Sequence, residues 1–530
     1  LQLGGSTKLE ITSGGIDVTG AITVDGSPLE TAPTLTAVAD GAIAANKAVA
    51  LTSAGKFKQI VEIKTALTQT TSKSGLSAAT IESGTYRDCA VAFNPDTGSV
   101  SGSISAPNGL NLVTYRGSST LWCEVCTSSG NSMSTNTMSK VAVTSNSVTN
   151  PPYNECIYMG DNYWLVAFRR SGGNPVSART VQFNGSGLTM GTEQSIESGG
   201  RDGTTIGLCR VSNTRAVAFF NHNNTLLYSI LDFSGSGSSR TFSRTNGASL
   251  DSAHLTTAKP KAIVTNSGHI VVVYSRNYGS GQGRAVAGTI SGAAGSGSIS
   301  WGTNVPIATT ANNVGIAYDS TNNVIGIRYK NGSPSGSGAL GAVHCAHNTS
   351  DNSLTITNHT GSGGDQEASD NEADMFCSDI GYFLCTYRNS SRQQIRGWTF
   401  SGTTPQWKSE YNCTNQTIEY PRCTYDTVTD CFVGVAANNS QNIVGGINNI
   451  HDTSSSGTAG SFLGFSAGAY SDGNTATVNT FGNTTTQSGL TTGSLHYVKL
   501  DGTLSTSATN TVCSCGTALS TTSLFIRDPS

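Results

Sequence analysis

Apolar and polar residues alternate along most of the chain in short runs, and one kind of run returns at a nearly constant interval. It reads YWLVAFRR at residues 163–170, an apolar stretch that ends in an aromatic ring and then in polar residues. Successive copies are separated by 49 residues, between Tyr387 and Ala436, to 58 residues, between Tyr329 and Tyr387. The seven copies end at Tyr115, Phe168, Phe219, Tyr274, Tyr329, Tyr387 and Ala436. This spacing is typical of β-propeller blades, whose repeats span about 40–50 residues.

Each repeat also contains four strand-like pieces. In the fourth repeat, KAIVTNSG (261–268) leads directly into IVVVYSRN (270–277), and the Asn, Ser and Gly between them favour a tight hairpin. Two further pieces follow in AVAGTISGAAGSGSISWGTNVPI (285–307), where a Gly- and Ser-rich turn separates them. Four antiparallel strands are the content of one propeller blade.

The apolar faces of such sheets must be covered by neighbouring sheets. A four-stranded sheet of this composition has two faces, and the sequence provides no helix to cover either of them. Its apolar residues are buried only when similar sheets stack on both sides. We therefore expect an all-β fold with a seven-bladed β-propeller, in which the aromatic-ended second strands fill the layers between blades. An open array of β-sandwiches is the alternative, and the regular spacing favours the propeller.

The sequence on either side of the repeats predicts further parts. Residues 1–30 contain the short pieces LEIT, IDVTG and AITVDG, which have too little apolar area to fold alone and suit a β-rich stem shared by three chains. A disordered linker is the alternative for this segment. Residues 31–64 and 462–530 share a texture of short alternating strands, so we expect them to form two halves of one small β domain. The propeller would then be an insertion at residues 65–461.

The seventh repeat is incomplete, which raises the question of how the ring closes. It supplies CTYDTVTD, CFVGVAANN and NIVGGINNI and then runs on without a fourth strand. The stretch FKQIVEIKTALTQTT (57–71) is strand-like and has no other assigned partner. We predict that it pairs into blade seven, because an unpaired sheet edge is prone to aggregation.

Charge and composition narrow the classes of function. Only 12% of the 530 residues are charged, compared with about 25% in an ordinary soluble domain. A net charge of −3 and a pI near 6.3 give no basic surface, so no nucleic-acid partner is expected. The longest apolar runs are about six residues, far shorter than a bilayer span, so no membrane insertion is expected. No signal peptide is recognised in LQLGGSTKLE.

The cysteines are placed as small hydrophobic residues rather than as metal ligands. Of 13 cysteines, six fall within apolar strand pieces, where we expect buried thiols. They are Cys156, Cys209, Cys377, Cys385, Cys423 and Cys431. Cys123 and Cys126 should point to opposite faces of a strand, whereas Cys513 and Cys515 should share one. Neither pair has zinc-site spacing to a second pair or to His, so no metal site is predicted, although a disulfide of Cys377 remains open.

Candidate chemistry is sparse. The densest acidic stretch, GGDQEASDNEADMF, could place paired carboxylates for glycoside hydrolysis or oxygen ligands for Ca²⁺, but a solvated loop is the simpler interpretation. Its acidic residues are Asp365, Glu367, Asp370, Glu372 and Asp374. The arginines Arg169, Arg170, Arg179, Arg201 and Arg210 are scattered and are expected to be solvated, and the eight histidines show no metal-binding spacing. We therefore assign no catalytic residue, no metal ligand and no cofactor.

Binding remains the better-supported class of activity, although no receptor-binding residue is identified. A propeller displays many loops on a rigid disc, and loops on rigid scaffolds commonly carry recognition. Aromatic residues in or near the turns could stack on sugar rings, with Asn and Ser supplying hydrogen bonds; packing between blades is the alternative role. These aromatics are Tyr153, Tyr278, Trp301, Trp407 and Tyr411.

The repeat form VAFNPDTG, then VVVYSRNYGSGQGRAVAGTISG, then GSISWGTNVPI resembles the blade repeat of structural proteins in tailed bacteriophages, particularly marine and cyanobacterial phages. The leader KLEITSGGIDVTGAITVDG resembles phage fibre and spike stems, and FLGFSAGAYSDGNTATV with LTTGSLHYVKLDGTLST resembles a small β module of the same proteins. The first repeat departs from the pattern through the insertion GSVSGSISAPNG (98–109), and the seventh is incomplete. The resemblance implies a homotrimeric virion fibre or spike subunit on the extracellular particle surface, which contacts other virion proteins.

Three functions follow as hypotheses. The first is a phage fibre or spike protein that presents its propeller to a host cell-surface glycan or protein. The second is a purely structural virion component of the head, collar or tail fibre, whose propeller mediates assembly. The third is a polysaccharide-degrading tailspike, which would be an enzyme with a site assembled across blades. The absence of a recognised catalytic motif favours a protein that is not an enzyme.

Overall fold

The computed structural model describes most of the chain, and its described part is built from β-strands. It leaves out residues 1–7, 13, 14, 20–22, 25, 26, 29–33, 67–78, 85, 100, 101, 103, 105, 107, 108, 130, 131, 135–137, 149–153, 172–174, 198–204, 254–258, 277–281, 309, 333–337, 360–365, 368–373, 390, 391, 439, 441 and 528–530. Elsewhere the only helical segments are three short 3₁₀ turns, at Pro95–Ser99, Gly237–Ser239 and Ala459–Ser461. No described helix has the length and apolar character needed to cross a bilayer. The predicted all-β class is therefore confirmed.

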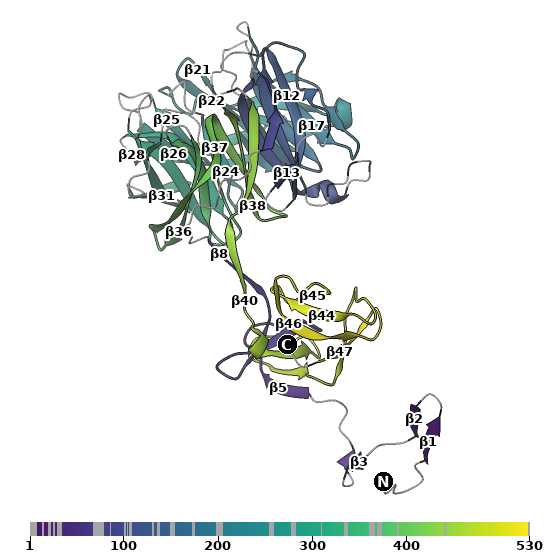
Figure 1. Ribbon diagram of the computed structural model, residues 1–530. Helices are drawn as coiled ribbons and strands as arrows, with labels where there is room; N and C mark the ends of the chain where they lie inside the picture. Colours follow the sequence, from purple (N-terminus) through teal and green to yellow (C-terminus); the bar gives the residue numbers. More distant parts are fainter. Residues whose placement is uncertain are drawn as a thin grey trace. The chain divides into compact units, whose positions relative to one another are not determined.

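The chain divides into two compact units. The smaller contains residues 1–65 and 452–530, and the larger contains residues 66–451. The chain passes between the units through β8 (Glu62–Ala66) and β40 (His451–Ser455), which pair with each other (Figure 1).

Five antiparallel sheets of similar construction follow one another in the larger unit, and we number them I to V in chain order. Sheet I contains β10 (Tyr86–Asn94), β11 (Leu110–Gly117), β12 (Thr120–Ser129), β13 (Ser132–Ser134) and β14 (Val141–Ala142). Sheet II contains β15 (Asn154–Gly160), β16 (Tyr163–Arg169), β17 (Val176–Phe183), β18 (Leu188–Met190) and β19 (Gln194–Ser195). Sheet III contains β20 (Ile206–Ser212), β21 (Arg215–His222), β22 (Thr225–Ser234) and β23 (Thr241–Asn246). Sheet IV contains β24 (Lys261–Val264), β25 (His269–Arg276), β26 (Gln282–Ser291), β27 (Ser298–Trp301) and β28 (Val305–Ala308). Sheet V contains β29 (Ala311–Asp319), β30 (Val324–Asn331), β31 (Gly338–Asn348), β32 (Ser353–His359) and β33 (Gln366–Glu367).

The rest of the larger unit is one seven-stranded sheet with two halves. Its strands are β34 (Asp374–Cys377), β35 (Phe383–Asn389), β36 (Arg392–Ser401), β37 (Thr404–Asp426), β38 (Cys431–Asn438), β39 (Ile443–Asn449) and β9 (Ala79–Glu82), paired in that order. The long strand β37 pairs with β36 through residues 404–417 and with β38 through residues 418–426. We call the part on the β36 side half VI and the part on the β38 side half VII. Each half contains four consecutively paired strands, as the main path of each of sheets I to V does.

The first strands of these sheets form a closed cycle. Each of β10, β15, β20, β24, β29 and β34 contacts the first strand of the next sheet or half, and β37 contacts both β34 and β10. The inner strands therefore surround one common centre, and the remaining strands of each sheet lie outward of them in order of pairing (Figure 1).

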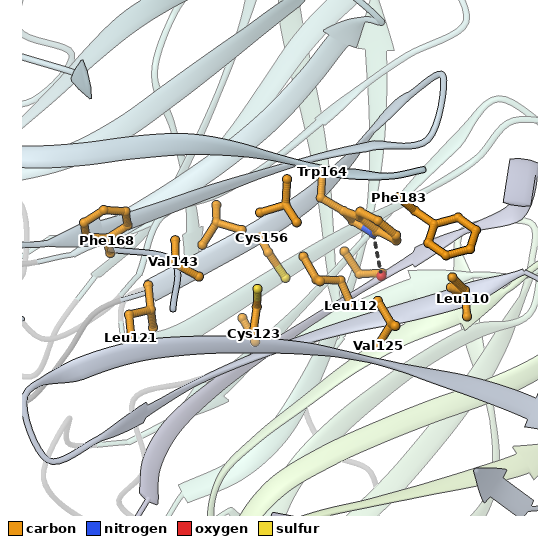
Figure 2. Packing of buried hydrophobic residues seen from close by; sticks show 14 of the residues in the cluster. Leu110, Leu112, Leu121, Cys123, Val125, Val143, Cys156, Trp164, Phe168 and Phe183 are labelled. Carbon is orange, nitrogen blue, oxygen red and sulfur yellow. Dashed lines mark hydrogen bonds between the residues drawn. The ribbon is translucent and has the colours of Figure 1, made fainter. Parts of the chain in front are cut away.

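Neighbouring sheets are held together by interlocking apolar side chains. Between sheets I and II, Leu112 and Cys123 meet Cys156 and Trp164, all at most 3% exposed (Figure 2). The indole nitrogen of Trp164 donates to the carbonyl of Ala92 across the layer at 3.0 Å. Burying an aromatic or aliphatic side chain of this size contributes about 1.5–3 kcal/mol, so each layer is a substantial source of stability.

The aromatic ends of the repeated second strands lie in these layers, as the sequence pattern predicted. Each of the six aromatic side chains is at most 1% exposed. They are Tyr115, Phe168, Phe219, Tyr274, Tyr329 and Tyr387.

The cysteines behave as the alternation predicted. Cys123 and Cys126 belong to different apolar clusters on opposite faces of β12, whereas Cys513 and Cys515 share one. Every described cysteine is a free thiol, including the half-buried Cys377, so the disulfide considered for that residue is not formed. Burial raises the pKa of the Cys209 thiol to about 12, which keeps it protonated and apolar in character.

The prediction that residues 57–71 close the seventh sheet is wrong. β7 (Phe57–Gln59) pairs with β6 (Ala48–Leu51), β8 pairs with β40, and residues 67–71 lie outside the described part. The strand that pairs with β39 is β9, with Val444 opposite Thr80. The physical reason is burial: Phe57 and Ile60 are buried in the smaller unit, whereas Ile81 of β9 is buried among residues of sheet I and half VII.

The smaller unit contains two five-stranded sheets. The first has the order β5 (Thr34–Val38), β42 (Thr475–Asn479), β41 (Phe462–Ser466), β6 and β7. The second has the order β43 (Thr484–Thr486), β47 (Ser523–Ile526), β46 (Thr511–Ala518), β44 (Leu495–Lys499) and β45 (Leu504–Ser505). Strands from both ends of the sequence therefore share the first sheet. Nearer the N-terminus, β1 (Lys8–Thr12) pairs with β2 (Gly15–Thr19), and β3 (Thr23–Val24) pairs with β4 (Ser27–Pro28).

Candidate functional site

A pocket of about 230 Å³ opens between sheet V and half VI. Three turns form it: the β29–β30 turn, the β34–β35 turn and the β36–β37 turn. Its lining residues are Asp319, Asn322, Val324, Ile380, Gly381, Phe383, Thr399, Phe400 and Gly402. Sites for drug-sized ligands occupy about 300–1,000 Å³, so this pocket suits a ligand the size of a single sugar ring.

The polar side of the pocket is held by Asp319. One of its carboxylate oxygens accepts hydrogen bonds from the backbone N–H groups of Thr321 and Asn322, both at 3.0 Å. The other accepts from the Asn322 side-chain amide at 2.7 Å. This arrangement is an Asx turn, which aspartate favours because its short side chain reaches the backbone two and three residues on. It leaves the exposed Asn322 fixed at the pocket rim.

Gly381 allows the two sheets to approach at this point. Its φ is +72°, a conformation that L side chains rarely adopt, and a Cβ there would lie 2.5 Å from the Asp319 carboxylate. A larger residue at position 381 would therefore push the β34–β35 turn away from Asp319.

The apolar wall of the pocket is aromatic. Phe400 lies edge-on to Phe383, with ring centroids 5.3 Å apart at 72°, and edge-on to His344 at 5.2 Å and 87°. Phe383 is buried and Phe400 is half-buried, so Phe400 presents part of its ring to solvent. An aromatic ring beside amide and hydroxyl groups can pack against the C–H face of a sugar while those groups bond its hydroxyls.

The charge of the pocket limits what it can bind. The described lining residues include one carboxylate, that of Asp319, and no lysine or arginine. Among these residues an anionic sugar would meet no opposite charge. Hydrolysis of a glycosidic bond needs two carboxyl groups about 5–9.5 Å apart, and the described lining supplies one.

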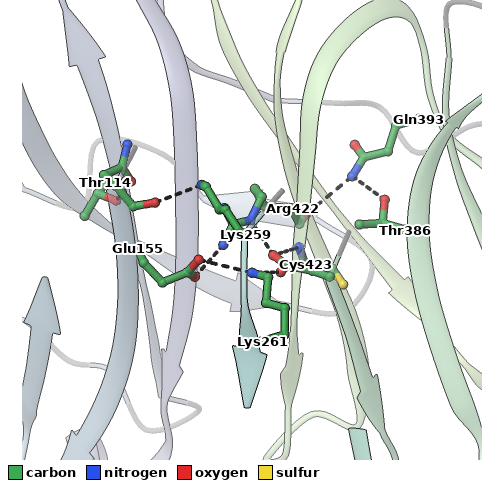
Figure 3. Close-up of polar contacts among 10 residues, drawn as sticks. Thr114, Glu155, Lys259, Lys261, Thr386, Gln393, Arg422 and Cys423 are labelled. Carbon is green, nitrogen blue, oxygen red and sulfur yellow. Dashed lines mark hydrogen bonds and ion pairs between the residues drawn. The ribbon is translucent and has the colours of Figure 1, made fainter. Parts of the chain in front are cut away.

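A second polar cluster lies among the first strands and is structural in character (Figure 3). Lys261 of β24 contacts Glu155 of β15 at 3.1 Å and Asp374 of β34 at 2.5 Å. Arg422 of β37 forms ion pairs with the same two carboxylates, which closes a ring of alternating charge. Burial alone would raise the pKa of Asp374, but Arg422 and Lys261 outweigh it and hold that pKa well below its usual range. Because each charge is balanced, the cluster joins strands from sheet II, sheet IV and the seven-stranded sheet rather than offering a free group to a ligand.

The aromatic residues considered for binding serve packing where the structure describes them. Trp301 lies edge-on to Tyr228 at 5.5 Å and to Phe219 at 6.3 Å, between sheets III and IV. Trp407 packs on the buried Trp398 at 5.2 Å. Tyr153 and Tyr278, and the side chain of Tyr411, lie outside the described residues.

The acidic stretch provides one described side chain, and it has a structural role. Asp374 belongs to the buried charge ring, and Glu367 lies in β33 without a described side chain. Asp365, Asp370 and Glu372 lie outside the described residues.

The scattered arginines are paired within the larger unit rather than fully solvated. Arg179 donates to the carbonyls of Gly191 and Val143, at 2.6 and 2.8 Å. Arg210 lies over the ring of Tyr158 at 5.2 Å. Arg201 lies outside the described residues.

Sequence reasoning missed the pocket because its three turns are far apart in the chain. One signal was present: YDSTNN at 318–323 has the same form as YDTVTD at 425–430. In both, the tyrosine O–H donates to the residue five positions on, Asn323 or Asp430. These two Asx-turn hairpins lie between the first and second strands of sheet V and of half VII.

No family model and no curated protein sequence matches the chain. Among solved structures, AofleA from Arthrobotrys oligospora is 10% identical, with 70% of this chain and 95% of that chain covered and a TM-score of 0.36. The Aleuria aurantia lectin, described as a six-bladed β-propeller, is 12% identical, with 63% and 98% covered and a TM-score of 0.37. A Hadza microbial sialidase is 12% identical, with 64% and 73% covered and a TM-score of 0.38. These values describe distant similarity of fold.

Proposed function

We propose that this protein is an attachment subunit whose larger unit binds a neutral sugar of a cell-surface glycan. In this proposal the larger unit is a seven-bladed β-propeller inserted into a split β domain. The observation that carries the proposal is the pocket between sheet V and half VI, where Phe400, Asn322 and Thr399 line a space for one sugar ring. The closed cycle of first strands supplies the rigid support that such a loop site needs.

The sequence resemblance supplies the biological setting of the proposal. A phage fibre or spike subunit acts at the surface of the virion, and three copies of one chain would present three equal pockets. A sugar of about 12 non-hydrogen atoms that contributes about 0.3 kcal/mol per atom binds with a Kd of roughly millimolar size. Trimeric display would raise the apparent affinity for a repeating polysaccharide without any new contact.

The test is direct binding of neutral monosaccharides and of host envelope polysaccharide to the full chain, measured by calorimetry and ligand-observed NMR. We expect weak, saturable binding of a neutral sugar that Asn322→Ala and Thr399→Val each reduce several-fold. Asn184→Ala is the matched control, because Asn184 is an exposed turn asparagine of sheet II.

Other results would redirect the assignment. No binding to any neutral sugar or host polysaccharide, or binding that Asn322→Ala leaves unchanged, would reject the pocket and favour a purely structural virion component. Release of reducing sugar ends from the polysaccharide would favour a degrading tailspike instead.

A further inference from the structure

Three potential metal ligands from separate parts of the larger unit converge at the β34–β35 turn. They are Asp379 in the β34–β35 turn, Asp430 in the β37–β38 turn and His451 at the start of β40. The Nε2 atom of His451 lies 3.1 Å from Oδ1 of Asp430 and 4.0 Å from Oδ1 of Asp379. One ligand atom from each residue lies within 4.8 Å of the other two.

The local structure holds these side chains in place. Asp430 has a φ of +58°, and the turn before it is fixed by Asp426, whose carboxylate accepts from the backbone N–H groups of Val428 and Thr429. The Tyr425 O–H donates to Asp430. When a donor outside a metal site makes such a hydrogen bond to a metal-ligating side chain, it orients that side chain and strengthens its binding to the metal.

The imidazole is similarly constrained, whereas the second carboxylate, that of Asp379, is exposed. The His451 side chain is 1% exposed and lies edge-on to the ring of Tyr382 at 6.4 Å. The Asp379 side chain is 54% exposed. One face of the cluster is therefore buried and preorganised, and the other is open to solvent, which gives an ion a path of entry.

We propose that Asp379, Asp430 and His451 bind one divalent transition-metal ion of the Zn²⁺ type. Ligand bonds of about 2.0–2.2 Å in a tetrahedral site place ligand atoms roughly 3.3–3.5 Å apart. The His451–Asp430 separation of 3.1 Å is already close to that value, and Asp379 needs to move roughly half an ångström closer to His451. The ligand oxygens of the two aspartates lie within 4.8 Å of each other and must also approach. The open side leaves the fourth position to water.

The ligand set favours a transition metal over Ca²⁺ or Mg²⁺. An imidazole nitrogen suits Zn²⁺, Co²⁺ or Ni²⁺, whereas Ca²⁺ takes six to eight oxygen ligands and Mg²⁺ needs an octahedral oxygen shell. Two carboxylates and one imidazole include a nitrogen ligand, which neither Ca²⁺ nor Mg²⁺ favours. Such an ion would clamp the start of β40 to turns of halves VI and VII, where the chain leaves the larger unit.

The experiment uses the full chain, treated with a chelator and then titrated with ZnCl₂ and CoCl₂. We expect one ion per chain by calorimetry and Co²⁺ ligand-field bands without a thiolate charge-transfer band, because none of the three proposed ligands is a cysteine. Asp379→Asn should weaken the affinity at least about tenfold and abolish the rise in Tm that Zn²⁺ causes in the unchanged chain.

Controls separate this site from other ion binding. Asp351→Asn alters an exposed aspartate of the β31–β32 turn and should leave the titration unchanged. His451→Asn, checked for a native circular dichroism spectrum, should weaken binding as Asp379→Asn does. The proposal is overturned by an absence of saturable binding, by a thiolate band, by tighter binding of Ca²⁺ than of Zn²⁺, or by full affinity in Asp379→Asn. The first of these results would leave His451 as an ion-pair partner of the two aspartates only.

Discussion

The fold disfavours the charged form of the Glu124 carboxyl group in β12. Its side chain is 1% exposed. Burial and then the nearby Glu82 raise its pKa to about 7, although a hydrogen bond from Tyr115 and the charge of Lys140 act in the opposite direction. Lys140 is itself engaged by Glu82 at 3.0 Å. The native state therefore keeps a proton on Glu124 at pH values where an unfolded chain has lost it.

The raised pKa of Glu124 predicts how the stability of the folded chain changes with pH. Because the folded pKa lies above the unfolded value of 4.5, the contribution of Glu124 to stability is greatest below pH 4.5 and is lost as the pH rises through about 7. Glu124→Gln cannot ionise, so we expect the variant to have a higher Tm than the unchanged chain at about pH 8 and a similar Tm at about pH 4.5. Calorimetric Tm values across that range provide the measurement. Glu62→Gln alters an exposed carboxyl group and should show the same dependence of Tm on pH as the unchanged chain. If the Tm curves of Glu124→Gln and the unchanged chain were parallel, the raised pKa of Glu124 would be contradicted.

At the scale of elements, β9 closes half VII although it is only four residues long. It adds the last strand beside β39, and Ile81 is 2% exposed in a cluster with Met133 of β13 and Val433 of β38. Gly445 makes room for this packing, because a Cβ there would lie 2.7 Å from the Met133 sulfur and 2.8 Å from the Ile81 side chain. One buried side chain therefore links the end of the cycle to its beginning.

Shortening the Ile81 side chain should weaken the contact by which β9 closes half VII. We expect Ile81→Ala to lower the free energy of unfolding of the larger unit by about 2–5 kcal/mol, as for other buried isoleucines cut to alanine. Hydrogen exchange should speed up first in β9 and β39, because their pairing depends on this contact. Thr80→Ala changes the exposed neighbour and should stay within about 0.5 kcal/mol. If β9 and β39 exchanged at the same rates in Ile81→Ala as in the unchanged chain, β9 would not be needed for closure.

Strand β9 also shows which elements of the fold could be predicted from the sequence and which could not. Continuous apolar pieces such as residues 163–169 were predicted as strands, and the burial of their aromatic ends followed from the same pattern. ATIE at 79–82 contains one large apolar residue, whereas residues 57–66 contain several, so the sequence favoured the wrong segment for the closing strand. The pocket at Asp319 and the cluster at His451 were not predictable, because each depends on which turns the stacking of sheets brings together.

At the scale of the whole molecule, the smaller unit has an apolar core of its own. One cluster combines Ala50 and Ile60 with Phe462, Phe465 and residues of the second sheet. The other combines Ala39, Val49 and Phe57 with Ala476 and Val478. None of the described members of either cluster comes from residues 66–451. The larger unit is thus absent from the packing that holds the two ends of the sequence together.

Removing the larger unit should therefore leave the smaller one folded. We expect a chain that joins residues 34–65 to residues 452–527 through an Asn-Gly turn to fold, because β8 and β40 already pair and such a turn suits a hairpin. Roughly 110 residues are enough for an independent core. Circular dichroism should show β structure with a cooperative thermal transition, and NMR should show dispersed amide signals. Phe465→Asp in the shortened chain, which places a charge at a fully buried position, should abolish both. A shortened chain that is disordered before that change would show that residues 66–451 are required for the smaller unit to fold, even though they supply none of the described members of its two clusters.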